Sequence, residues 1–193
     1  MRSSGRSKRS CANLPGNPPR IPERCPLTTV EMPTPESTMS GQLAFHRFDT
    51  CFLEHSSRWL QDLEIREMID SGEFSAERQR EWFNGLAARE DYFIWGISLE
   101  GLPVGAVGLK NIGDGVAEYF GYLGDKSCWG RGLGHQMLAF AEQEARKLGL
   151  SLLRLRVLDT NHRASRLYQR AGYLFCLRPD ANSRVFVKPL GGG

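Results

Sequence analysis

The chain has 193 residues, 40% of them hydrophobic, and a formal net charge of +3. This length favours one domain with a sizeable core and a short appendage, and it leaves too little chain for two full domains. Lys and Arg outnumber Glu by six to three within residues 1–40, so the remaining residues carry no net charge. This balance argues against a nucleic-acid partner, because phosphate backbones are held by an excess of cations.

The cysteines and the lack of long apolar runs bear on the cellular location. The five cysteines form no C-x-x-C pair and are odd in number, a usage that favours a reducing compartment. No apolar run of a signal peptide's length follows the basic N-terminus, and no 18-residue apolar span occurs anywhere. We therefore expect a cytoplasmic protein with no membrane partner.

Residues 1–40 differ in composition from the rest of the chain. Seven of the ten prolines lie between Pro15 and Pro35, among Ser and Arg residues and without apolar periodicity. The pattern predicts a disordered extension at 1–40, a folded domain at 41–190 and a flexible tail at 191–193. Two alternatives stay open: a basic arm that binds nucleic acid or a partner, and a working start at Met32 or Met39.

Apolar spacing predicts the elements of the first half of the domain. Two helices are expected, over residues 54–69 and 75–88. Two β-rich runs at 91–99 and 103–112, separated by a short turn, predict a hairpin, and residues 116–124 predict a third strand.

The second half alternates helices and strands. A glycine-rich loop precedes an amphipathic helix that ends near Leu148, and "SLLRLRVL" at 151–158 predicts a strand. Asn161 is a candidate cap for the next helix, which Gly172 would end. Two C-terminal strands complete the pattern. We expect an α/β fold with a mixed sheet flanked by helices.

The loop "CWGRGLG" at 128–134 is the strongest single motif. Glycines at the mouth of a helix allow positive φ angles and aim backbone amides at one point, where phosphate usually binds. A dinucleotide loop would need a third glycine at His135, and a Walker loop would need a lysine that is absent. Taken alone, the glycines also fit a tight strand-to-helix turn without a ligand.

The stretch "SCWGRG" resembles the acyl-CoA loop, Q/R-x-x-G-x-G/A, of the Gcn5-related N-acetyltransferases (GNAT). Gly130 and Gly132 occupy the glycine positions, whereas Ser127 replaces the usual Gln or Arg. A second segment, "LRVLDTNHRASRLYQRAGY", resembles that family's V-x-x-x-N-x-x-A-x-x-L-Y-x-x-x-G-F/Y pattern. The resemblance covers about residues 45–190, and two ordered motifs make a chance match improbable.

The resemblance implies a GNAT fold, in which a mixed, mostly antiparallel sheet has splayed strands at the acyl-CoA site. It implies direct transfer of an acetyl group from acetyl-CoA to an amine, with no metal. The cofactor-binding residues that it implies are Leu123, Gly124, Gly130, Arg131, Gly132, Leu133, Gly134, Asn161 and Ala164. A bulge at Gly121 and Gly124 would expose strand amides there.

Two residues are candidates for proton transfer. Tyr168 matches the family tyrosine that donates to the departing thiolate, although its spacing also fits a core tyrosine. Glu118 is the candidate base, acting directly or through water. The alternatives are an exposed strand carboxylate with no such role and a water chain that replaces the base.

The acceptor is expected to be a small-molecule amine bound by the first helices. The stretch "WLQDLEI" resembles the opening of family members that acetylate nucleotide-linked amino sugars, as in pseudaminic acid synthesis, so Trp59 and Arg58 are candidate substrate contacts. The alternative is that Trp59 is a core tryptophan and that Arg58 is a solvated arginine beside it. N-terminal acetylation of ribosomal proteins and a non-catalytic acyl-CoA-binding module remain alternatives. The sequence leaves a homodimer open.

Overall fold

A computed structural model describes residues 41–69 and 72–191. The predicted extension at 1–40 and residues 192–193 of the predicted tail lie outside these residues, so both stay predictions.

The described part contains one seven-stranded sheet with strand order β1-β2-β3-β4-β5-β7-β6. Only the β4–β5 pair is parallel, and the other five pairs are antiparallel. The expected mixed, mostly antiparallel sheet is therefore confirmed. The strands are β1 Leu43–Arg47, β2 Phe93–Leu99, β3 Leu102–Gly113, β4 Val116–Leu123, β5 Leu152–Leu158, β6 Leu174–Asp180 and β7 Ser183–Pro189.

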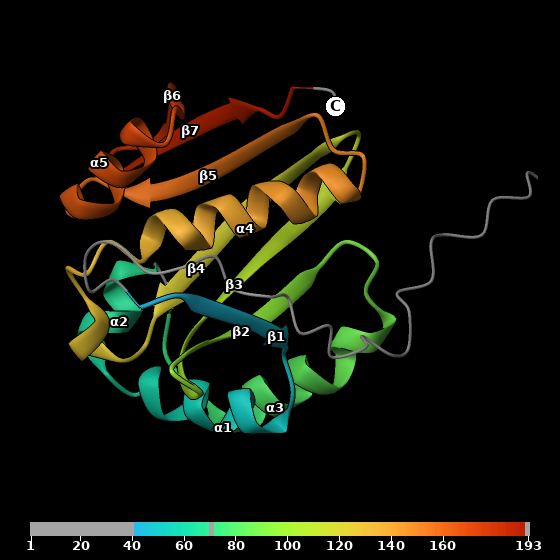
Figure 1. Ribbon diagram of the computed structural model, residues 1–193, viewed down its shortest axis with the longest axis vertical. Helices are drawn as coiled ribbons and strands as arrows, with labels where there is room; N and C mark the ends of the chain where they lie inside the picture. The colour runs from blue at the N-terminus through green and yellow to red at the C-terminus, as the bar shows by residue number, and fades with distance from the viewer. Residues whose placement is uncertain (1–40, 70–71, 192–193) are drawn as a thin grey trace, which may run out of the picture. The chain divides into compact units, whose positions relative to one another are not determined.

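Helices cover both faces of this sheet. Figure 1 shows α4 crossing in front of the central strands, and its buried residues belong to the same core cluster as Leu153 and Leu155 of β5. A second cluster, around Phe52 of α1 and Ala106 of β3, fills the opposite face. The helices are α1 Thr50–Trp59, α2 Leu63–Met68, α3 Ala76–Gly85, α4 Gly134–Lys147 and α5 His162–Arg170, with 3₁₀ turns η1 Leu86–Ala88 and η2 Lys126–Cys128.

The helix predicted over residues 54–69 is in fact two helices. The first, α1, ends at Trp59, and Asp62 caps α2 by accepting a hydrogen bond from the Glu64 amide at 3.0 Å. An Asp side chain competes with the helical hydrogen-bond pattern and starts a new helix more readily than it continues one. This break places α2 on its own, beside the β4–β5 strands.

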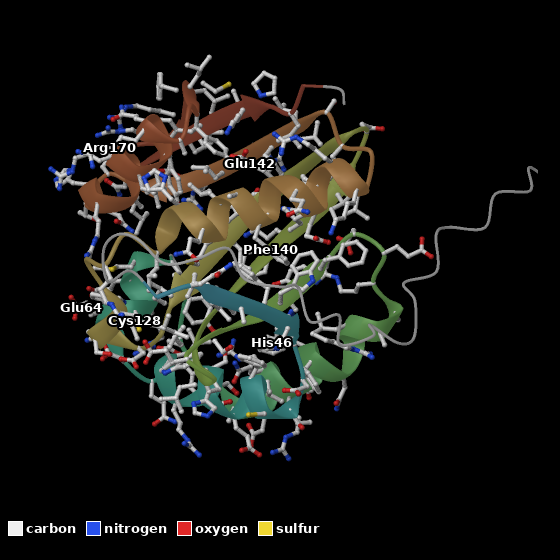
Figure 2. All side chains as sticks on the ribbon, in the orientation of Figure 1. His46, Glu64, Cys128, Phe140, Glu142 and Arg170 are labelled. Atoms are coloured by element: carbon white, nitrogen blue, oxygen red, sulfur yellow. The ribbon has the colours of Figure 1, made fainter. Side chains whose placement is uncertain are left out.

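Strand β1 was not among the predicted strands. Its partners are far away in sequence: Leu43 pairs with Leu99 of β2, and Phe45 stacks on Phe140 of α4 with ring centroids 3.9 Å apart. Figure 2 labels Phe140 on α4. The Gln136 side chain accepts a hydrogen bond from the Leu43 amide at 2.9 Å. Five residues are too few for a periodicity signal, so only tertiary contacts define this strand.

Strands β4 and β5 separate partway along their length. Their ladder runs from Val116–Leu152 only to Glu118–Arg154, although both strands continue. At Gly121 the predicted bulge is absent, because the β3–β4 register is continuous from Lys110–Glu118 to Gly105–Leu123. Beyond that stretch the amides of Gly124 and Asp125 both donate to the Val104 carbonyl, so two residues oppose one there, as in a bulge. Divergence of two parallel strands therefore opens the sheet, as the predicted splay required.

Candidate functional site

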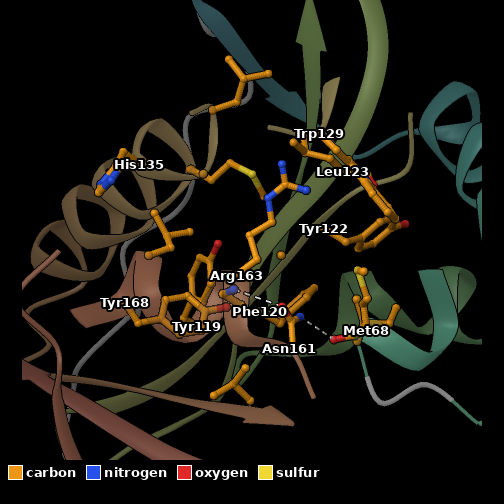
Figure 3. Close-up of a pocket in the computed structure, with 18 of the residues that line it drawn as sticks. Met68, Tyr119, Phe120, Tyr122, Leu123, Trp129, His135, Asn161, Arg163 and Tyr168 are labelled. Atoms are coloured by element: carbon orange, nitrogen blue, oxygen red, sulfur yellow. Dashed lines mark hydrogen bonds between the residues drawn. The ribbon is translucent and has the colours of Figure 1, made fainter. Parts of the chain in front are cut away.

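A cavity of about 500 Å³ occupies the fork between β4 and β5. It is lined by the splayed halves of both strands, by α2, by the N-terminal end of α4 and by one face of α5. Figure 3 shows side chains from these segments converging on it. Of the predicted site residues, the lining includes Glu118, Leu123, Gly130, Gly132, Leu133, Gly134, Asn161, Ala164 and Tyr168.

The glycine loop presents bare backbone to this cavity. Gly130 and Gly132 have φ angles of 84° and 77°, in the left-handed region that favours glycine. A Cβ on Gly132 would meet no atom within 4 Å. Leu133, at the cap position of α4, makes no side-chain cap hydrogen bond, and the amides of residues 132–134 have no acceptor within the described part of the chain. These amides and the positive end of the helix dipole can hold a diphosphate.

The start of the loop is fixed by contacts within the protein. The Trp129 indole donates to the Leu123 carbonyl at 2.8 Å, which ties the loop to the end of β4. Ser127, at the position where the family pattern has Gln or Arg, turns to Asp125 instead. Its amide and hydroxyl both donate to the Asp125 carboxylate, at 2.9 Å and 2.7 Å.

Two of the predicted cofactor residues do not line the cavity. The Gly124 amide donates to the Val104 carbonyl at 2.8 Å, and a Cβ there would lie 2.0 Å from the Trp59 ring. Arg131 is exposed on the loop. Gly124 and Arg131, which were predicted to bind the cofactor, therefore have no contact with the cavity.

Asn161 connects two walls of the cavity. Its side-chain oxygen accepts a hydrogen bond from the Ala164 amide at 3.0 Å, so it caps α5 as predicted. Its side-chain nitrogen lies 3.4 Å from the Met68 carbonyl at the end of α2. Figure 3 shows both contacts as dashed lines.

Tyr168 lies deep in the cavity among other aromatic rings. Its ring centroid is 6.2 Å from that of Tyr119, in an edge-to-face arrangement, and 6.4 Å from that of Phe186. Burial raises the pKa of Tyr168 to about 12, because the phenolate is poorly solvated there. No described residue is recorded as bonded to its hydroxyl. The side chain is thus a core tyrosine that lines the cavity.

Glu118 lies at the last paired position of the fork and already has partners. One carboxylate oxygen is 3.0 Å from the Lys110 ammonium, and the other is 3.5 Å from the Arg154 guanidinium and 3.4 Å from the Asn111 amide. Its side chain is 18% exposed. It shares a sheet face with Phe120 and Tyr122, as the alternation of β4 predicted.

Sequence reasoning missed three arginines that line the cavity from α5. Arg163, Arg166 and Arg170 occur at spacings of three and four, so they lie on one helix face. A guanidinium nitrogen of Arg163 lies 2.9 Å from the position that a Cβ of Gly130 would occupy. Figure 3 shows this side chain pointing into the cavity. The spacing of these three arginines was the sequence signal that could have identified them as one helix face.

The two residues predicted to contact the acceptor do not line the cavity. Trp59 covers Gly124 and meets Tyr122 edge-to-face, with ring centroids 6.3 Å apart. Arg58 is exposed on α1. From this part of the fold the cavity is instead lined by Ile65, Met68 and Ile69, from α2 and its C-terminal end.

The Tyr122 hydroxyl is held from below the cavity. It lies 2.7 Å from the Ser56 hydroxyl on α1, which in turn accepts a hydrogen bond from Gln79 of α3 at 2.8 Å. Burial raises the pKa of Tyr122 to about 12. This network fixes the position of α1 and α3 against the cavity wall.

No group of three His, Cys, Asp or Glu side chains suited to a metal occurs among the described residues. In that same part of the chain, none of the helices is long and apolar enough to cross a membrane.

A family model described as "Acetyltransferase (GNAT) family" matches residues 57–173, which is more than half of the chain. The matched segment includes both the glycine loop and α5. No curated relative matches the sequence.

Several solved structures have the same fold at low identity. A spermidine N-acetyltransferase from Vibrio cholerae, in complex with CoA and spermine, superposes with a TM-score of 0.70 at 15% identity, covering 77% of this chain and 96% of the other. A domain from Methanocaldococcus jannaschii gives 0.70 at 17%, with 77% and 99% covered. An aminoglycoside acetyltransferase in complex with coenzyme A gives 0.62 at 20%, with 77% and 95% covered.

Proposed function

The chain belongs to the acetyltransferase (GNAT) family, and from that premise we propose that it transfers an acetyl group from acetyl-CoA directly to a primary amine, within the folded domain at 41–190 and in the cytoplasm. The observation that carries this proposal is the glycine loop, whose amides open onto a fork that leads to Tyr168. The favoured acceptor is a small amine such as a nucleotide-linked amino sugar.

The cofactor diphosphate is held by the loop amides at 132–134, with Arg163 beside Gly130 supplying positive charge. Free amides at a helix N-terminus and an arginine fork suit a phosphate ester. The pantetheine arm then follows the exposed edge of β4, where the strand has lost β5 as a partner. The Leu123 amide at the end of that edge is a donor for the carbonyl oxygen, which gains negative charge during transfer.

Acetyl-CoA supplies the acetyl group as a thioester. The C–N bond to the neutral amine forms as the C–S bond breaks; the amine nitrogen loses one proton and the departing sulfur gains one. Tyr168 supplies the proton that the departing sulfur gains, by donating it from its hydroxyl. Because the pKa of Tyr168 is raised to about 12, the hydroxyl stays protonated over the physiological range.

The proton of the amine leaves toward Glu118. Since both carboxylate oxygens already have partners in Lys110, Arg154 and Asn111, we place a water between Glu118 and the amine rather than direct contact. In this arrangement Glu118 orients the water that takes up the proton.

The experiment that tests the function measures free thiol released from acetyl-CoA in the presence of amines of several kinds: UDP-amino sugars, peptides with free N-termini, polyamines and aminoglycosides. Calorimetry on the same preparation measures acetyl-CoA binding. We expect binding and turnover with at least one amine. Binding without turnover for any amine would mean a non-catalytic acyl-CoA-binding module, and no binding at all would exclude both functions.

A further inference from the structure

The cavity passes through the sheet, which gives it two sides. Tyr119 of β4 lines it from the face covered by α4, whereas Tyr122 lines it from the face covered by α1. Figure 3 shows Met68 of α2 on the side of Tyr122, across the cavity from His135 of α4. If the proposed function holds, the cofactor occupies the side of the glycine loop and α4, which we call the cofactor side. The amine then approaches from the other side.

Apolar side chains from two elements line this other side. Ile65, Met68 and Ile69 line the cavity at spacings of three and four, so one face of α2 and its C-terminal end is turned toward it. Phe120 lines the same side from β4. Met68 is 38% exposed, so part of its side chain remains available to a ligand. The amine therefore meets an apolar surface as it arrives.

The position of α2 is fixed by polar contacts that leave its apolar face uncovered. At its N-terminal end, the Lys126 ammonium lies 2.6 Å from the Asp62 carboxylate and 2.7 Å from that of Glu64. At the other end, the Asn161 side chain lies 3.4 Å from the Met68 carbonyl. A helix of six residues is not stable by itself. These contacts therefore set the direction in which its apolar face points.

The charged side chains that line this other side already have partners. Glu118 is 3.0 Å from Lys110 and 3.5 Å from Arg154, and among the described residues it is the only carboxylate that lines the cavity. Arg156 also lines the cavity, from β5, and its guanidinium is 2.8 Å from the Asp180 carboxylate. Each of these charges is thus engaged by a charge of opposite sign.

The acidic side chains of α2 lie beside the cavity and not in its wall. Glu64 and Glu67 line a smaller groove, which shares Met68, Asn161 and Arg163 with the cavity. Glu64 is engaged by an ion pair at 2.7 Å, and neither carboxylate belongs to the cavity lining. A second ammonium group on the acceptor would therefore have to leave the apolar surface to reach either of them.

We propose that the acceptor carries an apolar group directly beside the amine that is acetylated, and that Met68, Ile69 and Phe120 bind this group. The proposal rests on the proposed function and narrows its small amine. Packing on these side chains removes apolar surface of the ligand from water, which favours binding. A hydroxyl, amide or ammonium in the same place would lose its water without gaining a partner. A deoxy amino sugar, a cyclic alkyl amine and an apolar first residue of a peptide all present such a group.

The test compares acceptors in matched pairs, with the full chain and saturating acetyl-CoA. The first pair is cyclohexylamine and aminopiperidine, in which a ring ammonium replaces a methylene. The second is a UDP-amino sugar that has a methyl group on its ring and its hydroxymethyl counterpart, and the third is a peptide that begins with leucine and one that begins with asparagine. We expect kcat/KM to be about tenfold or more higher for the apolar member of at least one pair, because the polar member loses hydration as well as apolar contact. The pair that responds identifies the source of the apolar group.

Variants of α2 test the side chain of Met68. Met68→Gln replaces the thioether by an amide of similar length, and we expect the apolar-to-polar ratio of kcat/KM to fall about fivefold or more. Met68→Leu should keep the ratio. Leu63→Gln is the matched control on the same helix and should not change it, because Leu63 is 59% exposed and does not line the cavity. The Asn161 contact uses the Met68 carbonyl, so these variants retain it, and a ratio measured within one protein does not depend on how much of it is folded.

Three outcomes would overturn the inference and leave the proposed function standing: no preference for the apolar member in any pair, a higher kcat/KM with spermidine than with cyclohexylamine, or an unchanged ratio in Met68→Gln. Acetyl-CoA binding with no acceptor at all would instead contradict the proposed function.

Discussion

The two sides of the cavity are built by different means. The cofactor side depends on backbone: left-handed glycines, amides that have no partner among the described residues and a helix N-terminus, all within one short segment. The other side depends on side chains from segments far apart in sequence, namely Met68 of α2, Lys110 on β3 and Arg156 on β5. A continuous motif therefore identifies the cofactor, whereas acceptor choice can change through single side chains without altering the fold. The following predictions test that difference, from the largest expected effect to the smallest.

Gly132→Asp should weaken acetyl-CoA binding by about a hundredfold or more. The φ of 77° is strained for any residue with a Cβ, at a cost of about 1–2 kcal/mol, and a carboxylate would face the diphosphate. Calorimetry with CoA measures the loss. Gly101→Asp is the matched control, since Gly101 has a φ of 80° and equally open surroundings in the β2–β3 turn. Equal loss in both variants would mean strain alone, and unchanged affinity in Gly132→Asp would mean that the loop does not hold the diphosphate.

Tyr168→Phe should lower kcat by about ten- to a thousandfold, the usual range for a proton donor, with little change in acetyl-CoA affinity. The variant keeps the ring contacts with Tyr119 and Phe186. Tyr173→Phe is the control, because its hydroxyl is buried without a hydrogen-bond partner among the described residues. Steady-state kinetics on both variants distinguish a chemical role from packing. Unchanged kcat in Tyr168→Phe would remove the hydroxyl from the mechanism.

Arg163→Ala should raise KM for acetyl-CoA by about tenfold and leave kcat nearly unchanged, because a charge-assisted hydrogen bond to phosphate contributes to binding throughout the reaction. Arg163→Lys should recover part of the affinity. Arg80→Ala, on α3 and exposed, should have no effect. A fall in kcat at constant KM would instead place Arg163 near the reacting atoms.

The smallest effect at neutral pH concerns the buried tyrosines. Burial raises the pKa of Tyr168 and of Tyr122 to about 12, against about 10 in an unfolded chain. The folded state therefore holds these protons more tightly, so their contribution to stability is complete below pH 10 and is lost as the pH rises toward 12. Thermal unfolding from pH 8 to 12 should show a constant Tm and then a fall. Tyrosinate absorbance of the native protein near pH 10 would contradict this prediction.

Elements with a strong local pattern were predictable. The hairpin of β2 and β3, the glycine loop before α4 and the Asn161 cap of α5 each depend on neighbouring residues, and the structure confirms them. The break between α1 and α2 was missed because apolar spacing continues through Asp62. Strand β1 was missed because its contacts lie about 50 to 95 residues away.

The candidate site also has a part that the sequence predicts and a part that it does not predict. The sequence by itself determined the family and the loop, because the positive φ angles of Gly130 and Gly132 and the helix that follows are encoded within a few residues. Only the tertiary structure decided that Trp59 covers Gly124, that α5 turns three arginines into the cavity and that Glu118 is held between Lys110 and Arg154. The physical reason is that backbone conformation is set locally, whereas the surroundings of a side chain depend on which distant strands and helices the fold brings beside it.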